Sequence, residues 1–442
     1  MVKNPSKKTI SFYTLGCRLN QSETTVIQRT FENDGYHVVD FNHPADVVVI
    51  NTCTVTENGD AETRRLVSKV NRLNPSTRIA LIGCQAQMQK EKLAHLPNVQ
   101  WVVGNGVKMG LQAIVEATEP QAPPQVITPT IHRERFTMPA VGIDRFHTRA
   151  NIKIQDGCDF FCSFCEIPYA RGRARSRVFD DILLEANALA AAGHKELVMT
   201  GINVGTYEDE GKNLLDVIEA LEQIEGLKRI RISSIEPTTI PDRLIQKMAE
   251  GSKLCRYLHI PLQSGHNTIL QEMKRKYTVE EFSRFVQYAN NTVKKICIGT
   301  DVIVGFPGET DEHFQQTVDL LKTLPIHYFH VFSYSKRTMA QSGHLPGAVD
   351  PAVIHQRSKT LRHLSQRKRD LFYQSLVGTT QEVLFEETKG GMAAGMTDNF
   401  VRVSMPSNID LHNHLKRVDL ISCRGSTLLA EASDSLSHAH SR

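Results

Sequence analysis

The sequence lacks a long uninterrupted apolar run and has no marked excess of one charge. We find no apolar segment long enough to span a bilayer, and the polar stretch Met1–Lys8 has no apolar signal core. The 52 basic and 48 acidic residues give a formal net charge of only +4, so a nucleic-acid partner has to be argued from local patches. We therefore expect a soluble, cytoplasmic protein with no membrane partner.

Cysteine is also too sparse for a secreted disulfide scaffold, since the 442 residues contain nine. In the cytoplasm these thiols stay reduced and are available as metal ligands. The length alone predicts about three domains.

Three of the cysteines follow the pattern Cys158-x3-Cys162-x2-Cys165, with no fourth Cys or His in the same stretch. A structural zinc site needs four protein ligands, and an ordinary four-iron cluster needs four thiolates. Three thiolates on a four-iron cluster leave one iron open to a substrate or cofactor, which indicates a reactive site. The alternative is a zinc knuckle with a distant fourth ligand, but the unequal spacing and the Phe-rich loop favour iron.

The first part of the chain alternates short apolar strands with amphipathic helices, which predicts a small parallel-sheet α/β domain. The expected strands are Ile10–Thr14, Val47–Asn51, Ile79–Ile82 and Trp101–Val103, and the expected helices lie around 21–34 and 60–73.

Cys17, Cys53 and Cys84 each follow one of the first three of these strands. Ligands of open parallel sheets gather at the carboxyl ends of the strands, so we expect the three thiols to converge on a second metal site, again with three ligands. The alternative is three unrelated buried thiols.

A Pro-rich stretch of low pattern follows and predicts a linker ending near Arg145. Strand and helix then alternate six times, which predicts an incomplete parallel barrel, since closure needs eight units. The strands are expected near 150–154, 196–200, 229–234, 256–260, 297–304 and 328–333. Polar or Gly-rich motifs follow nearly every strand, and the chemistry of such barrels lies on that rim.

Residues 351–374 read as a basic helix, either a solvated face or a contact to an RNA backbone. Five short strands after about 376 predict a small barrel, a shape that often binds oligonucleotides. They are expected at Gln381–Phe385, Met392–Met396, Val401–Met405, Arg417–Ser422 and Thr427–Ala432.

The cysteine loop resembles that of radical S-adenosylmethionine enzymes, and the whole chain resembles the methylthiotransferases from about Thr9 to Glu431. This resemblance implies an α/β fold: an N-terminal parallel-sheet α/β domain, a radical-SAM partial (βα)6 barrel and a small C-terminal all-β TRAM barrel. The implied domains are an N-terminal methylthiotransferase domain with an auxiliary cluster over 8–118, a linker over 119–145, a radical-SAM domain over 146–374 and the TRAM domain over 375–438.

The residues around Cys17, Thr14-Leu15-Gly16-Cys17-Arg18-Leu19-Asn20-Gln21-Ser22-Glu23, resemble the group that acts on N6-threonylcarbamoyladenosine beside the tRNA anticodon. The alternatives within the family act on isopentenyladenosine in tRNA or on a ribosomal protein. Two places depart from the family pattern: Thr338-Met339-Ala340 replaces a Gly-Thr pair, and Gly395–Phe400 replaces a form richer in Tyr.

The resemblance implies two [4Fe-4S] clusters and S-adenosyl-L-methionine as cofactors. Cys158, Cys162 and Cys165 would hold the catalytic cluster, where one electron cleaves S-adenosylmethionine to a 5′-deoxyadenosyl radical that removes hydrogen from C2 of the adenine. Cys17, Cys53 and Cys84 would hold the cluster that delivers sulfur, and a second S-adenosylmethionine would supply the methyl group. The implied partners are the tRNA anticodon stem-loop and an electron-donor reductase.

Six further residues are expected to contact the cofactor. Arg171 and Arg173 are candidates to grip its carboxylate, although a solvated loop or an RNA contact is the alternative. Asn203, Gln263 and Ser264 are candidates for hydrogen bonds to it, and Glu236 for its ribose, unless these rim residues only satisfy loop backbone groups. His259, Cys255, Cys297 and Cys423 are expected in the core. The competing function class is a non-catalytic iron–sulfur RNA-binding protein.

Overall fold

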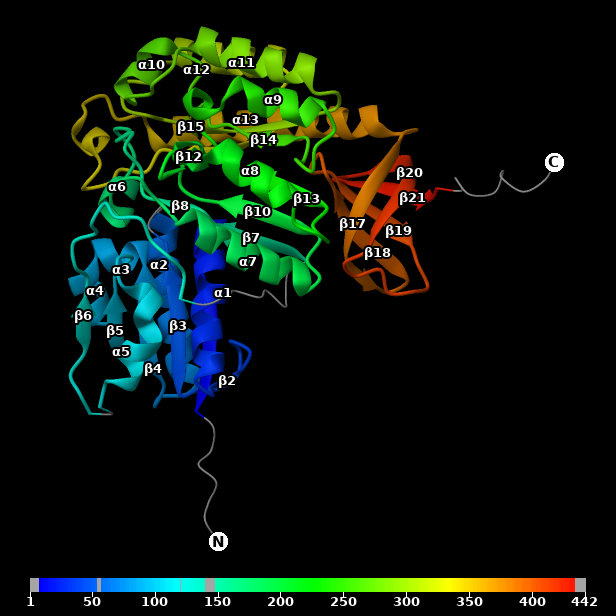
Figure 1. Cartoon of the computed structure of the whole chain (residues 1–442). Coiled ribbons are helices and arrows are strands. Elements are labelled where there is room, and N and C mark those ends of the chain that lie inside the picture. Colours follow the sequence, from blue (N-terminus) through cyan, green and yellow to red (C-terminus); the bar gives the residue numbers. More distant parts are fainter. Residues whose placement is uncertain (1–7, 54–56, 120, 140–147, 434–442) are drawn as a thin grey trace, which may run out of the picture.

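The chain folds into three consecutive parts that Figure 1 shows in blue to cyan, green to yellow, and orange to red. The structure is a computed structural model and describes residues 8–53, 57–119, 121–139 and 148–433. The polar residues 1–7 and the predicted end of the linker near Arg145 lie outside the described residues. No described helix is long and apolar enough to cross a membrane.

The N-terminal part is a six-stranded parallel sheet in the order β2-β1-β3-β4-β5-β6, as predicted for its four longer strands. Its strands are β1 (Thr9–Thr14), β2 (His37–Val38), β3 (Val47–Thr52), β4 (Arg78–Gly83), β5 (Val99–Val103) and β6 (Gln125–Ile127), and its helices are α1 (Arg18–Asn33), α2 (Glu57–Leu73), α3 (Cys84–Met88), α4 (Lys90–Ala94) and α5 (Leu111–Glu116). Helices α1 and α2 confirm the two predicted ones.

The linker prediction is wrong for residues 125–127. This segment pairs in parallel with β5, from Trp101↔Gln125 to Val103↔Ile127, and becomes the edge strand of the sheet. The Pro-rich flanks of this segment concealed a strand of three residues, whose backbone groups satisfy the open edge of β5.

The middle part has six parallel strands in two groups of three, β13-β10-β7 and β14-β15-β16. A parallel bridge between Ile230 and Leu254 joins the groups, so the predicted partial barrel is confirmed. The strands are β7 (Arg149–Lys153), β10 (Glu196–Thr200), β13 (Arg229–Ile232), β14 (Tyr257–His259), β15 (Cys297–Val304) and β16 (Tyr328–Ser333), and the helices are α6 (Ile167–Arg171), α7 (Phe179–Ala191), α8 (Leu214–Glu222), α9 (Asp242–Ala249), α10 (Asn267–Glu272), α11 (Val279–Thr292), α12 (Asp311–Thr323) and α13 (Pro351–Leu376). Two short antiparallel pairs of strands are added to it: β8 (Gln155–Asp156) with β9 (Arg175–Ser176), which enclose the cysteine loop and α6, and the hairpin of β11 (Glu208–Asp209) with β12 (Lys212–Asn213).

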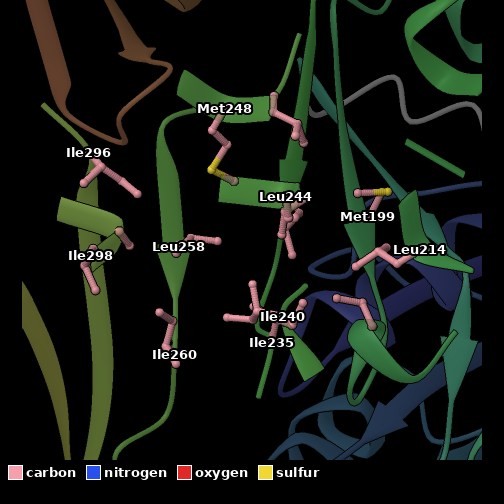
Figure 2. Close-up of a cluster of buried hydrophobic side chains, with 14 of the residues drawn as sticks. Met199, Leu214, Ile235, Ile240, Leu244, Met248, Leu258, Ile260, Ile296 and Ile298 are labelled. Atoms are coloured by element: carbon pink, nitrogen blue, oxygen red, sulfur yellow. The ribbon is translucent and has the colours of Figure 1, made fainter. Parts of the chain in front are cut away.

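Successive side chains of each strand point to opposite faces of the sheet, so that apolar side chains face the surrounding helices and polar or aromatic ones face the inside of the partial barrel. Leu258 and Ile298 belong to the largest apolar core, beneath the helices, and Figure 2 shows them beside Ile260 and Ile296. Their neighbours Tyr257 and His259 therefore face the inside of the barrel. His259 is buried there, as predicted.

The last part is a closed barrel in the order β17-β18-β19-β21-β20, which confirms the five predicted strands. The strands are β17 (Thr380–Lys389), β18 (Met392–Thr397), β19 (Arg402–Pro406), β20 (Leu415–Arg424) and β21 (Thr427–Ala432). Cys255 and Cys297 are buried as expected, and Cys423, near the end of β20, is half-buried and packs against the apolar cluster of the barrel.

The turn between β18 and β19 docks this barrel against the amino ends of the partial-barrel strands. Arg256 forms a two-pronged ion pair with Asp398, at 2.6 and 2.9 Å, and Arg231 donates to the Asp398 carbonyl at 2.9 Å. Phe400 adopts a φ of +62° and stacks at 4.5 Å on the ring of Tyr257. One of the two departures from the family pattern thus forms a contact between domains.

Gly299 of β15 leaves space for the ring of Tyr328 inside the partial barrel. A Cβ at this position would lie 2.4 Å from the ring of Tyr328, whose hydroxyl lies 2.6 Å from that of Tyr257.

We expect Gly299→Ala to destabilise the protein by about 1–3 kcal/mol, because the added methyl group overlaps the Tyr328 ring. The measurement is the midpoint of thermal unfolding. Gly110→Ala is the matched control, since nothing lies within 4 Å of its Cβ position. Equal midpoints for the two variants would contradict this packing.

Candidate active site

The loop with Cys158, Cys162 and Cys165 lies between β8 and α6, beyond the carboxyl end of β7. Its start is fixed by a hydrogen bond from the Cys158 amide to the Gly172 carbonyl at 3.2 Å. Gly157 has a φ of +71°, and a Cβ there would lie 2.0 Å from the Arg173 carbonyl oxygen, so only glycine fits. The sequence thus folds the three thiols into one tight loop on the predicted rim.

Each thiol of this loop accepts a hydrogen bond. The amides of Phe160 and Ile167 donate to the sulfurs of Cys158 and Cys165 at 3.4 and 3.5 Å, and Arg275 Nη1 lies 3.1 Å from Cys162 Sγ. Burial raises the pKa of Cys158 to about 11 and that of Cys165 to about 12. The free thiols are therefore neutral at pH 7, and a metal that binds them has to displace their protons. Three sulfurs with donors aimed at them suit an iron–sulfur cluster.

Arg275 is a site residue that sequence reasoning missed. Its buried guanidinium also pairs with Glu236, and its Nε donates to the Tyr277 hydroxyl at 3.0 Å. Burial raises the pKa of Glu236, while Arg275 opposes that rise. The only signal in the sequence is the basic run Lys274–Lys276, which says nothing about its partners.

The second set of cysteines gathers at the carboxyl ends of β1, β3 and β4. Cys17 precedes α1, Cys53 follows β3, and Cys84 starts α3. Gly16 brings the first two together, because a Cβ at Gly16 would lie 2.8 Å from Cys53 Sγ. Part of Cys17 is accessible to solvent, yet desolvation of its thiol by the surrounding protein raises its pKa. The charge of Arg171 opposes this rise, and the charge of Cys84 adds to it. These three loops converge as the sheet topology predicts.

Cys84 is tied to the cysteine loop of the barrel. Asn105 donates one hydrogen bond to Cys84 Sγ at 3.5 Å and another to the Ala170 carbonyl of α6 at 2.8 Å. Because α6 directly follows Cys165, the two sets of cysteines are held by adjoining elements.

Arg171 lies in this junction and not in a cofactor pocket. Its guanidinium is fully buried, donates to both carboxylate oxygens of Glu23 at 3.0 and 3.1 Å, and reaches Asp156 at 2.9 Å. The prediction that Arg171 grips the cofactor carboxylate therefore conflicts with its position, because acids 15 and 148 residues away already engage it. Arg173 instead faces solvent, where it pairs with Asp159 and stacks at 4.6 Å over the ring of Phe161.

A cavity of 210 Å³ opens beside the cysteine loop. Its lining includes Cys165, Gln263, Asp301, Tyr334 and Arg337. Gln263 has a φ of +71°, and its buried Oε1 makes no hydrogen bond within the described part of the chain. A buried, unpaired amide oxygen at a cavity wall fits a ligand with N–H or O–H donors.

Asn203 and Ser264 are not among the residues that line this cavity. The side-chain Oδ1 of Asn203 accepts from Thr239 at 3.1 Å, while its buried Nδ2 has no hydrogen-bond partner among the described residues. Ser264 is buried, and its hydroxyl accepts from the His266 amide at 3.3 Å. Of the predicted cofactor residues, only Gln263 is among the described residues that line this cavity.

Two families of known proteins match the chain. Residues 152–321 match the Radical SAM superfamily, and residues 9–104 match the Uncharacterized protein family UPF0004. Among solved structures, the radical S-adenosylmethionine methyltransferase TsrM from Kitasatospora setae has a TM-score of 0.56 at 17% identity and covers 76% of this chain and 77% of its own. That likeness shows the fold over about three quarters of the chain.

Curated relatives span nearly the whole length. The threonylcarbamoyladenosine tRNA methylthiotransferase MtaB of Bacillus subtilis is 37% identical over 93% of this chain and 94% of that protein. The MtaB of Aquifex aeolicus is 38% identical over 89% and 96%. A tRNA-2-methylthio-N(6)-dimethylallyladenosine synthase of Desulfotalea psychrophila is 32% identical over 86% and 89%. The chain therefore belongs to the radical S-adenosylmethionine methylthiotransferase family, in the group of threonylcarbamoyladenosine tRNA methylthiotransferases.

Proposed function

We propose that this protein methylthiolates C2 of N6-threonylcarbamoyladenosine beside the anticodon of tRNA. The observation that carries the proposal is the pair of three-cysteine sets, one after a strand of the partial barrel and one at the sheet edge of the N-terminal domain, joined through Asn105. A single set would support radical formation alone. Two adjoining sets suit a reaction that also inserts sulfur.

Within this proposal, Cys158, Cys162 and Cys165 hold a [4Fe-4S] cluster that binds S-adenosylmethionine, and Cys17, Cys53 and Cys84 hold the auxiliary [4Fe-4S] cluster. When bound, these groups supply the radical that removes hydrogen from C2 and the sulfur that replaces it. The chain supplies orientation: the Phe160 and Ile167 amides and Arg275 stabilise the thiolates of the first set.

Gln263 is the residue that we propose for direct contact with S-adenosylmethionine, because its buried Oε1, at the cavity wall, has no hydrogen-bond partner among the described residues. Asn203 Nδ2 likewise has no partner in the described part of the chain, and Glu236 and Ser264 support this region through Arg275 and the His266 amide. Arg173 is too exposed for the cofactor and suits RNA phosphate. Arg171 is instead a positioning residue.

The RNA contacts in the proposal come from the basic helix α13 and the TRAM-like barrel. Lys359, Arg362 and Arg367 are exposed on α13, whereas Arg357 is buried against Glu309 and Asp311. Exposed cations would position the anticodon stem-loop through its phosphates. The proposal includes a cytoplasmic location and an electron-donor reductase that reduces the first cluster.

The deciding experiment compares tRNA nucleosides from a deletion strain and its parent by mass spectrometry. Loss of the methylthio-threonylcarbamoyl nucleoside is expected, and restoration by a plasmid copy is the control. Loss of the isopentenyl product would reject the proposed substrate. An unchanged nucleoside profile would favour the non-catalytic RNA-binding alternative.

Replacing Cys162 should remove the first cluster and leave the second. For Cys162→Ala we expect no 5′-deoxyadenosine after reduction, and a loss of about four iron atoms per chain. Cys423→Ala is the matched control, because that half-buried thiol lies far away in the C-terminal barrel and should leave the iron content unchanged. Wild-type 5′-deoxyadenosine formation by Cys162→Ala would exclude this division of roles.

Replacing Cys53 should remove sulfur insertion and leave the cleavage of S-adenosylmethionine intact. Cys53→Ala is expected to cleave S-adenosylmethionine, because the barrel loop is intact, but to form no methylthiolated RNA. Liquid chromatography with mass spectrometry follows both products in one reaction. If this variant still thiolates RNA, the auxiliary site is not the source of sulfur.

A further inference from the structure

A third polar cluster lies inside the partial barrel, apart from both sets of cysteines. It contains His259 of β14, Asp301 of β15 and His330 of β16, and one ligand atom from each lies within 4.8 Å of the others. His259 Nε2 lies 3.1 Å from Asp301 Oδ1, and Asp301 and His330 are direct partners in the strand register. Nothing in the proposed radical chemistry uses these side chains.

The cluster contributes one residue to each of two cavities. Asp301 lines the 210 Å³ cavity beside Cys165. His330 lines a second cavity of 140 Å³, together with Tyr328, Arg369 of α13 and Phe400 of the C-terminal barrel. Because Asp301 and His330 are direct partners across two paired strands, the walls of the two cavities meet at this pair of residues.

His259 and His330 differ in their hydrogen bonds. The Ser234 hydroxyl lies 3.0 Å from His259 Nδ1 and forms a hydrogen bond with it, whereas His259 Nε2 lies 3.1 Å from Asp301 Oδ1 without a hydrogen bond to any described residue. His330 is exposed and makes no side-chain hydrogen bond within the described part of the chain.

Arg369 adds a positive charge beside His330. Its buried Nε has no hydrogen-bond partner among the described residues, and it lines the same cavity. Although part of the His330 side chain reaches solvent, desolvation of its ring by the surrounding protein lowers its pKa; the charge of Asp301 opposes this shift, and those of His259 and Arg369 add to it. An unpaired guanidinium next to an imidazole suits a carboxylate.

We infer that His330 and Arg369, backed by Asp301 and His259, form the pocket for the threonylcarbamoyl group of the target adenosine. This inference rests on the proposed function and assigns the residues that read its substrate. The group ends in a carboxylate, which His330 and Arg369 would bind. It also carries ureido N–H groups and a hydroxyl, which would donate hydrogen bonds to the Asp301 carboxylate. The isopentenyl group of the alternative substrate offers none of these contacts and would leave the pocket unpaired.

Two histidines and a carboxylate are also a ligand set for divalent transition metals. One observation favours the substrate over a metal ion. The Arg369 cation lines the same cavity as His330. A metal ion there would meet a positive charge.

The test uses the reconstituted full-length enzyme and two anticodon stem-loop RNAs of one sequence. One carries the threonylcarbamoyl group, and the other carries its carboxamide analogue, which lacks the negative charge. The readout is the ratio of the two kcat/KM values for methylthiolated product. Cluster loss lowers both values together, so the ratio reports on recognition alone.

For wild type we expect a clear preference for the carboxylate. Arg369→Gln and His330→Leu should each reduce that preference by about tenfold to a hundredfold, the effect of losing one hydrogen bond to a charged group. Arg369→Lys keeps the charge and should retain part of the preference. His95→Leu, an exposed histidine of the N-terminal domain, is the matched control and should keep the wild-type ratio.

Three results would contradict the inference, and they differ in whether the proposed function remains valid. A wild-type ratio in both Arg369→Gln and His330→Leu overturns the pocket assignment and leaves the proposed function intact. Loss of a metal ion beyond the clusters from His330→Leu, measured by elemental analysis, replaces the pocket with a metal site. A wild-type enzyme that methylthiolates neither RNA overturns the proposed function and the pocket with it.

Discussion

The arrangement of the active site depends on a buried network of charges between the first two domains. Glu23 of α1 accepts from Lys108 at 2.6 Å, from Lys153 at 2.7 Å and from Arg171. Burial alone would raise the pKa of Glu23, but Arg171, Lys108 and Lys153 outweigh it and hold that pKa well below its usual value. A buried charge that loses its partner costs several kcal/mol, on the order of 3–5, so the network tolerates one geometry only.

This geometry fixes the distance between the two sets of cysteines. Glu23 lies on the helix that begins beside Cys17, and Arg171 ends the helix that begins beside Cys165. Asp156 completes the network from the strand that leads into the cysteine loop. In the proposed function, radical formation and sulfur delivery take place at sites on either side of this junction. A rigid junction keeps the distance and orientation between the two sites constant.

Much of the architecture could be predicted because periodicity and spacing are local signals. The six barrel strands and the convergence of Cys17, Cys53 and Cys84 follow from alternation and from the geometry of parallel sheets. What could not be predicted depends on pairing across the chain. Four arginines follow the cysteine loop, and no local pattern says that Arg171 meets Glu23, or that Arg275 meets Cys162, 113 residues away. The strand β6 was missed for the same reason, since among the described strands it pairs with β5 alone.

Helix α13 has a mechanical consequence for how RNA is presented. Its first half is anchored to the partial barrel by Arg357, which pairs with Glu309 and Asp311. Its last turns place Phe372, Tyr373 and Leu376 in one apolar cluster with the C-terminal barrel. The helix runs unbroken over Pro351–Leu376, so no flexible tether separates the two bodies. The continuous helix and the apolar cluster therefore hold the small barrel in a fixed orientation relative to the partial barrel.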